Sequence, residues 1–183
     1  KEIVRRLSPR NCLDLGCGTG VYVTEFNSQS IDATGVEGNL AVRPGLSPLL
    51  KSKIIFSDLR APLPLAQKFD LVFCVEVVEH IEPEYVEIVI ENISAHAGKW
   101  IFMTYGIDSK GTNPEHLNEQ PAEYWIEKIE KKGFVYDRNL SQEFMSVYDT
   151  CLRSGSPIRR IVTACLGKSR NMGLDWFAEK VLI

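Results

Sequence analysis

Short runs of hydrophobic residues alternate along the chain with longer segments in which hydrophobic residues recur at helical spacing. Runs of four to seven residues without a polar-face pattern are typical of strands that are buried on both faces of a sheet. The alternation of such strands with helices predicts an α/β domain in which helices cover both faces of a parallel sheet. The predicted strands are residues 11–16, 33–37, 54–57, 69–75 and 99–105.

Proline and glycine mark the ends of the helical segments. Pro83 and Pro121 each stand where a helix would begin, a position that tolerates the missing N–H of proline. Gly133 follows the second of these segments and is a typical stop signal. Each helix would present one hydrophobic face to the sheet: Val86, Val89 and Ile93 in the first, and Trp125, Ile126 and Ile129 in the second.

The last third of the chain continues the alternation. We predict a strand at 134–137, a helix at 140–152 and a final strand at 158–166. The tail 171–183 has hydrophobic residues at helical spacing, namely Leu174, Trp176, Phe177 and Val181. No repeat or low-complexity segment interrupts the pattern, so we expect one domain over residues 1–183.

Three glycines follow the first predicted strand in the run Leu-Asp-Leu-Gly-Cys-Gly-Thr-Gly at residues 13–20. A strand that ends at Leu15, a glycine turn and a helix that begins near Val21 predict a loop whose free N–H groups face a nucleotide-type ligand. The spacing is not the G-x-G-x-x-G of dinucleotide-binding loops, because the third glycine comes two positions after the second. Asp14 beside the loop favours a cationic ligand over a pyrophosphate.

The run resembles motif I, D-x-G-x-G-x-G, of the class I S-adenosylmethionine-dependent methyltransferases. Their cofactor carries a sulfonium and an ammonium group and no phosphate, which suits Asp14. The resemblance covers about residues 10–140. It implies a doubly wound, Rossmann-like, seven-stranded sheet with an antiparallel last strand, and the strands at 134–137 and 158–166 would form that closing pair.

Two acids at later strand ends extend the cofactor site. Glu37 lies 21 positions after Gly16, near the ~20 expected of an acid that binds ribose hydroxyls. Asp58 follows the third strand, where the resemblance implies contact with the adenine amino group, and the next residue would pack on the base. The expected cofactor-binding residues are Asp14, Gly16, Cys17, Gly18, Gly20, Glu37, Gly38, Asp58, Leu59 and Val75.

A second group of polar residues follows the fourth strand. Glu76, Glu79 and His80 have the i, i+3, i+4 spacing that places side chains on one face of a helical turn. His116 comes from the loop after the fifth strand, and the carboxyl ends of parallel strands meet at one edge. Two carboxylates and two imidazoles beside a cofactor predict a site for a divalent metal ion.

The pattern E-x-x-E-H resembles that of the ubiquinone-biosynthesis O-methyltransferases, and with a later His it resembles the small-RNA 3′-terminal 2′-O-methyltransferases. The resemblance implies that Glu76, Glu79, His80 and His116 bind Mn²⁺ or Mg²⁺, which orients and activates an acceptor hydroxyl. The interval of 36 residues between His80 and His116 is shorter than expected of the RNA enzymes. Two alternatives stay open: metal-free general-base catalysis by His80 or His116, and purely structural roles.

The segment Glu115 to Ile126, followed by Gly133-Phe134, resembles the H-x-N-x-Q-P-x-x-Y-W…G-F segment of methyltransferases of cell-surface polysaccharide and glycan pathways. It implies an O-methyltransferase whose acceptor is a sugar or glycan hydroxyl. The alternatives are an RNA 2′-O-methyltransferase, an O-methyltransferase of phenols or catechols, and a cofactor-binding scaffold domain without catalysis.

Composition narrows the class of protein. A formal net charge of −3 argues against a general nucleic-acid binder, and the basic cluster Arg159, Arg160, Lys168 and Arg170 is interpreted as a solvated surface. Five cysteines without a C-x-x-C pair indicate a reducing, cytoplasmic compartment. We expect no signal peptide and no membrane span. Because the chain begins with Lys1, we also consider it a domain of a longer protein with further domains as partners.

Overall fold

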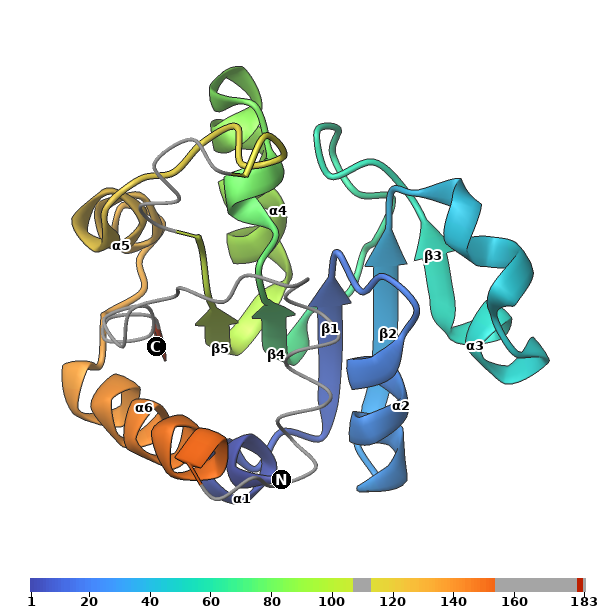
Figure 1. Ribbon diagram of the computed structural model, residues 1–183, viewed down its shortest axis with the longest axis horizontal. Coiled ribbons are helices and arrows are strands. Elements are labelled where there is room, and N and C mark those ends of the chain that lie inside the picture. Colours follow the sequence, from blue (N-terminus) through green and yellow to red (C-terminus); the bar gives the residue numbers. More distant parts are fainter. Residues whose placement is uncertain (107–112, 154–180, 183) are drawn as a thin grey trace.

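Five parallel strands form the sheet that the hydrophobic runs predict (Figure 1). The computed structural model describes residues 1–106, 113–153 and 181–182. The strands lie in the order β3-β2-β1-β4-β5. From β1 the successive strands β2 and β3 are added on one side of the sheet, and β4 and β5 are added on the other side. Their bounds are β1 (Asn11–Leu15), β2 (Asp32–Glu37), β3 (Ile54–Phe56), β4 (Phe69–Cys74) and β5 (Ala97–Met103).

The C-terminal part of the prediction is corrected in two places. Residues 134–137 do not form a strand. They lie between α5 and α6, and only Tyr136 among them forms an isolated β-bridge. Val181, which the hydrophobic spacing of the tail placed on a helix, instead belongs to the two-residue strand β6 (Val181–Leu182). This strand pairs antiparallel with β5, Phe102 lying opposite Val181. The expected strand 158–166 lies outside the described residues, and the seven-stranded sheet therefore stays a prediction.

Helices connect the strands as the hydrophobic spacing predicts. Pro83 forms the first position of a short 3-10 helix that leads directly into α4, and Pro121 is the N-cap of α5. The α-helices are α1 (Glu2–Leu7), α2 (Val21–Ser28), α3 (Pro48–Lys53), α4 (Val86–His96), α5 (Ala122–Glu130) and α6 (Arg138–Arg153). The 3-10 helices are η1 (Leu40–Gly45), η2 (Val78–His80) and η3 (Pro83–Tyr85).

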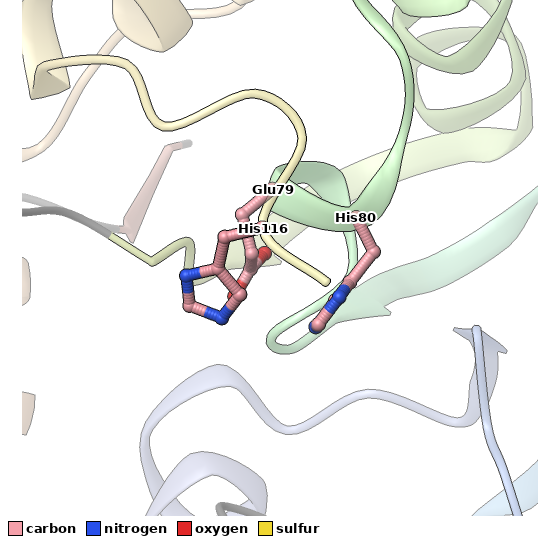
Figure 2. Close-up of side chains that lie close together, drawn as sticks. All are labelled: Glu79, His80 and His116. Carbon is pink, nitrogen blue, oxygen red and sulfur yellow. The ribbon is translucent and has the colours of Figure 1, made fainter. Parts of the chain in front are cut away.

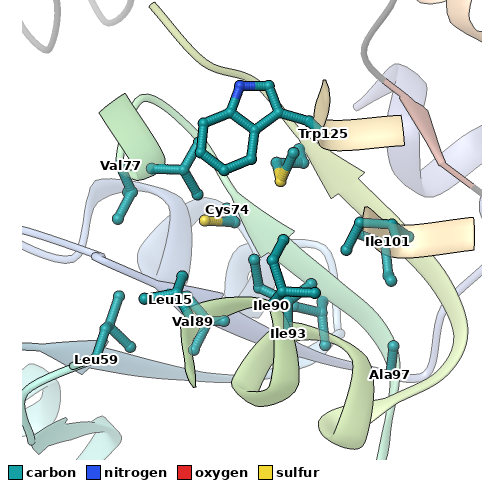
Figure 3. Packing of buried hydrophobic residues seen from close by; sticks show 14 of the residues in the cluster. Leu15, Leu59, Cys74, Val77, Val89, Ile90, Ile93, Ala97, Ile101 and Trp125 are labelled. Carbon is teal, nitrogen blue, oxygen red and sulfur yellow. The ribbon is translucent and has the colours of Figure 1, made fainter. Parts of the chain in front are cut away.

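The two faces of the sheet are covered by different helices because successive side chains of a strand point to opposite faces. Leu13 and Leu15 of β1 belong to the cluster that α4 and α5 cover, and Figure 3 shows Leu15 with Ile90, Ile93 and Trp125 in that cluster. Cys12 belongs to the opposite cluster, which α1, α2 and α6 cover. All six residues of β4 are buried, as expected for a central parallel strand.

The carboxyl ends of β1 and β4 are adjacent, with Leu15 of β1 opposite Cys74 of β4. In doubly wound sheets, ligands bind at this point, where the strand order changes direction. The glycine loop follows β1, and the E-x-x-E-H segment follows β4. Within residues 1–106, 113–153 and 181–182, no helix is both long and apolar enough to span a bilayer.

Candidate functional site

The glycine loop closes tightly against the end of β2. The backbone N–H groups of Gly16 and Cys17 both donate to the carbonyl oxygen of Val36, at 2.9 and 3.0 Å. Gly16, Gly18 and Gly20 all have positive φ, of 69°, 53° and 76°. The loop thus has the left-handed backbone that its glycines predict, and α2 begins directly after it at Val21.

The glycine loop is open to a ligand on the side of Gly18. A Cβ built on Gly18 would meet no atom within 4 Å, so the backbone is accessible to a ligand there. At φ 53° a larger residue would also be strained. Both the conformation and the free space fit a loop that a ligand approaches closely.

Asp14 is a buried acid beside the loop. It is 2% exposed, and its Oδ2 atom has no hydrogen-bond partner among the described residues. Burial raises the pKa of the Asp14 carboxyl well above its usual range, and the nearby charge of Glu37 raises it further. A buried carboxylate oxygen without a partner at the end of a strand fits a cationic ligand group, such as the ammonium of S-adenosylmethionine.

Glu37 connects the end of β2 to the glycine loop. Its Oε2 accepts the N–H of Gly18 at 2.6 Å, and its Oε1 accepts the N–H of Asn39, also at 2.6 Å. Each carboxylate oxygen can accept a further hydrogen bond. The acid is therefore fixed in place and still able to receive two hydroxyl groups.

Asp58 lies at the surface, paired with Arg60. The guanidinium and the backbone N–H of Arg60 both donate to the Asp58 carboxylate, and these bonds lower its pKa. Arg60 also binds Glu82 at 3.0 Å, just after η2. Gly38 is exposed and lies beside Asp58, since a Cβ on it would be 3.9 Å from the Asp58 Cα.

Three other residues expected at the cofactor have side chains that pack in the core. Leu59 is 5% exposed within the α4 cluster, so its side chain does not form an exposed platform for a base. Cys17 is buried, and a Cβ on Gly35 would lie 2.5 Å from its Sγ. Val75 is half-buried against the opposite cluster. The sequence analysis expects all three residues to bind the cofactor, and that expectation stays a prediction.

The structure brings together Glu79, His80 and His116, shown in Figure 2. One potential ligand atom from each of the three residues lies within 4.8 Å of the others. Glu79 is fully buried, and the two imidazole rings stand edge to face with centroids 5.0 Å apart. One carboxylate and two imidazoles in this arrangement fit a divalent transition-metal ion.

Hydrogen bonds outside the cluster orient both imidazoles. The Nδ1–H group of His80 donates to the carbonyl oxygen of Glu115 at 2.9 Å, and Nδ1 of His116 lies 2.6 Å from Oε1 of Glu119. The Nε2 atom of each ring can then serve as a ligand atom, as in many metal-binding histidines. The loop itself is fixed because the N–H groups of Leu117 and Asn118 donate to the Glu79 carbonyl.

Glu76 does not belong to this group of three. Its backbone is left-handed, with φ 56°, and its N–H donates to the Thr104 hydroxyl at 3.0 Å. The same hydroxyl donates to Oε1 of Glu76. Thr104 thus holds the Glu76 side chain at the end of β5, and Glu76 is not among the residues whose ligand atoms lie within 4.8 Å of one another.

The two groups of residues adjoin one another. A Cβ on Gly16 would lie 2.5 Å from Cγ2 of Val77, so the glycine loop contacts the segment that carries Glu79 and His80. Burial raises the pKa of the Cys74 thiol, and the charges of Glu79, Asp14 and Glu76 add to that effect. Acidic side chains of both groups therefore lie around the end of β4.

Three residues of the site had no role in the sequence prediction. Thr104 holds Glu76, Glu119 holds His116, and Gly106 leaves room for the His116 ring, since a Cβ there would be 2.6 Å from Cε1. Thr104 stands at the carboxyl end of β5, and Glu119 lies three residues after His116. Their places in the sequence could have suggested roles for Thr104 and Glu119. The contact of Gly106 with His116 is visible only in the structure.

Residues 1–146 match a family model described as a methyltransferase domain. Among curated proteins, none matches the chain with significant sequence similarity.

Solved structures share the fold. A SAM-dependent methyltransferase from Archaeoglobus fulgidus is 20% identical over 73% of this chain and 66% of that protein, with a TM-score of 0.58. The methyltransferase domain of the bacterial protein CtHen1-CN is 16% identical over 74% of this chain and 83% of that one, with a TM-score of 0.59. CalS10, an amino pentose methyltransferase from Micromonospora echinaspora, is 20% identical over 60% of this chain and 50% of that protein, with a TM-score of 0.50.

These identities establish similarity of fold alone, and the matches span less than two thirds of the Archaeoglobus and Micromonospora proteins. The family match covers most of the chain, and the glycine loop, the acid at the end of β2 and the strand order agree with it. The chain therefore belongs to the methyltransferase-domain family and has the fold of S-adenosylmethionine-dependent methyltransferases.

Proposed function

We propose that the chain is an S-adenosylmethionine-dependent O-methyltransferase that acts on a hydroxyl of a sugar or glycan with the help of a divalent metal ion. One observation carries the proposal: Glu79, His80 and His116 converge within 4.8 Å, on a segment that contacts the glycine loop through Val77 and Gly16. A methyl donor and a metal-held hydroxyl would therefore meet at one edge of the sheet.

The cofactor site supports this function through charge and hydrogen bonding. The Oδ2 of Asp14, which has no hydrogen-bond partner in the part of the chain that the structure describes, is suited to the ammonium of the cofactor. Glu37 is suited to the two ribose hydroxyls. The open space at Gly18 would let the methionine part of the cofactor lie against the backbone. Asp58 is proposed for the adenine amino group, in a position that Arg60 already orders.

Glu79, His80 and His116 would hold the metal ion. A divalent ion bound to these residues would lower the pKa of an acceptor hydroxyl and hold its oxygen for attack. Two imidazoles favour Mn²⁺ over Mg²⁺ by ligand softness. Because Thr104 holds Glu76 apart from the three, Glu76 is the weakest candidate of the four expected ligands.

The protein itself contributes mainly orientation. Methyl transfer is an in-line displacement at carbon, so the rate depends on how well the acceptor oxygen and the sulfonium are aligned. The hydrogen bonds from Leu117 and Asn118 to the Glu79 carbonyl fix the loop of His116 on the segment of His80. The two imidazoles thereby keep a constant relation to the glycine loop.

The sugar or glycan acceptor rests on the H-x-N-x-Q-P segment and on the fold shared with an amino pentose methyltransferase. Incubation with a tritium-labelled methyl donor, Mn²⁺ and mixtures of glycans or nucleotide sugars tests it. The label should appear on sugar and resist mild base, as an ether does and a methyl ester does not. Base-labile label, label on nitrogen, or full activity after exhaustive chelation would contradict the proposal.

An RNA 2′-O-methyltransferase is the second candidate, favoured by the two imidazoles that lie with Glu79 in the candidate metal site. The basic cluster at residues 159–170, which this function would need, lies outside the described residues. Labelled RNA oligonucleotides with a free or a blocked terminal 2′-hydroxyl separate the two candidates. Methylation of the free terminus alone, with binding that weakens as salt rises, would favour RNA.

A further inference from the structure

We propose that Glu119 is a positioning residue that fixes the Nδ1–H tautomer of His116. The lone pair of the ring then lies on Nε2, in a ring that packs beside Glu79 and His80. The use of that lone pair to hold a metal ion rests on the proposed function, whereas the tautomer itself does not. Glu119 follows His116 by three residues in the loop between β5 and α5.

The side chains of Glu119 and His116 are in direct contact. Nδ1 of His116 lies 2.6 Å from Oε1 of Glu119, and the side chains are only 11% and 20% exposed. An ionised carboxylate only accepts hydrogen bonds, so the proton between the two groups belongs to Nδ1. A neutral imidazole with a proton on Nδ1 carries its lone pair on Nε2.

The His116 ring is also closely packed among its other neighbours. A Cβ on Gly106 would lie 2.6 Å from Cε1 and 2.9 Å from Nδ1 of the ring, and 3.1 Å from Cγ of Glu79. The ring therefore lies directly on the backbone of Gly106 and beside Glu79. His80 contacts it edge to face at 5.0 Å between centroids. A ring packed this closely has little freedom to flip, and the bond to Glu119 determines which nitrogen is protonated.

The two histidines differ in what holds them. His80 donates to a backbone carbonyl, that of Glu115, which is neutral and cannot be removed by a side-chain substitution. His116 is held by a carboxylate, which makes a stronger, charge-assisted bond. Carboxylates that orient metal-binding histidines typically matter 10- to 100-fold for metal affinity. Removing the Glu119 carboxylate should therefore affect one ligand of the three selectively.

Nitrogen NMR of the protein without added metal tests the tautomer directly. In protein labelled with ¹⁵N, the ring of His116, assigned by comparison with His116→Gln, should show a protonated Nδ1 and an unprotonated Nε2. Glu119→Ala should lose this pattern, and Glu119→Gln should keep it because an amide oxygen accepts the same N–H. Glu115→Ala is the matched control, since the backbone carbonyl of Glu115 accepts the hydrogen bond of His80 and its side chain is exposed.

Calorimetry with Mn²⁺ alone, and then with S-adenosylmethionine, gives the second measurement. Glu119→Ala should weaken Mn²⁺ binding about 10- to 100-fold, Glu119→Gln should restore most of it, and cofactor affinity should stay within twofold. If wild type shows the expected tautomer but binds no Mn²⁺, the metal part of the proposed function fails and the positioning of His116 stands. A wild-type ring protonated on Nε2, or an Ala variant identical to wild type, would overturn the proposal.

Discussion

Gly18 donates its backbone N–H to Oε2 of Glu37 at 2.6 Å, so the glycine loop and the acid at the end of β2 are directly bonded. The other oxygen of Glu37 accepts the N–H of Asn39. The carboxylate therefore connects the loop after β1 with the loop after β2. It has a structural function in addition to the binding of ribose that its position in the sequence predicts.

Replacement of Glu37 should weaken cofactor binding more than the loss of two ribose contacts alone would. Each charge-assisted hydrogen bond contributes roughly 1.5–3 kcal/mol, and Glu37→Gln also weakens the bonds that order Gly18 and Asn39. We expect the dissociation constant of S-adenosylmethionine to rise at least tenfold, as measured by calorimetry.

Asp32 provides the matched control for this prediction. It begins the same strand at the opposite edge of the sheet, where its side chain is 72% exposed and pairs with Lys53. Asp32→Asn should leave cofactor affinity unchanged. Equal affinities of the Glu37 and Asp32 variants would remove Glu37 from the cofactor site.

Glu79→Gln should separate function from stability. Glu79 is 0% exposed, and an ionised carboxylate is costly to bury. A neutral amide of the same shape should leave the unfolding midpoint unchanged or raise it, while Mn²⁺ affinity and turnover fall at least 100-fold. Thermal unfolding and metal titration of the same preparations check both parts. A midpoint several degrees lower would mean that the carboxylate serves the fold.

Most of the sheet could be predicted because hydrophobic runs, glycines and prolines act locally. Four of the five predicted parallel strands begin within one residue of their observed starts, and Pro83 and Pro121 stand where helical turns begin. The segment 134–137 has the same hydrophobic character but lies between two helices, where only Tyr136 forms a bridge. Local pattern does not say whether a neighbouring strand is available.

The candidate site was predictable in residue type but not in arrangement. The spacing of Glu76, Glu79 and His80 indicated one helical face, and η2 does bring Glu79 and His80 together with His116. The left-handed backbone at Glu76 breaks that helical face, and the partner that holds it, Thr104, is 28 residues away in the sequence. Contacts between distant segments, such as that of Glu76 with Thr104, leave no periodic signal.

Thr104→Val should destabilise the protein because it removes the hydroxyl that binds Glu76 twice. Thr104 is 1% exposed, so Glu76 would lose a donor and an acceptor in a site with little access to water. We expect a loss of about 1–3 kcal/mol in the free energy of unfolding, measured in urea. Thr104→Ser keeps the hydroxyl and should recover most of this loss.

The same pair of variants tests whether Glu76 binds metal. If Thr104 holds Glu76 away from the metal, Thr104→Val should leave Mn²⁺ affinity equal or higher, because the carboxylate is released. Mn²⁺ affinity that falls together with stability would indicate that the bond to Thr104 orients a fourth ligand.

Asp70 should stabilise the protein above about pH 4 and lose this effect in acid. Arg10 donates to its carboxylate from both the guanidinium and the backbone N–H, and Lys99 also pairs with it, so its pKa lies well below the usual 3.8. A lowered pKa means that the unfolded chain takes up the proton first as pH falls. Asp70→Asn should therefore be less stable by roughly 0.5–1 kcal/mol at pH 7. Urea unfolding should show this difference shrinking below pH 4.

Asp14 should give the opposite pH dependence, because burial raises its pKa well above 3.8 and the charge of Glu37 adds to the effect. The unfolded chain then releases the Asp14 proton at a lower pH than the folded protein does. The stability of wild type relative to Asp14→Asn is therefore highest below pH 4 and falls as pH rises toward the folded pKa. Urea unfolding at several pH values from 4 upward should show Asp14→Asn gaining on wild type as pH rises. A constant difference across this range would mean that the pKa of Asp14 is not raised in the folded protein.

Asp14→Asn should also bind S-adenosylmethionine at least tenfold more weakly, because the buried carboxylate oxygen that fits the ammonium is absent.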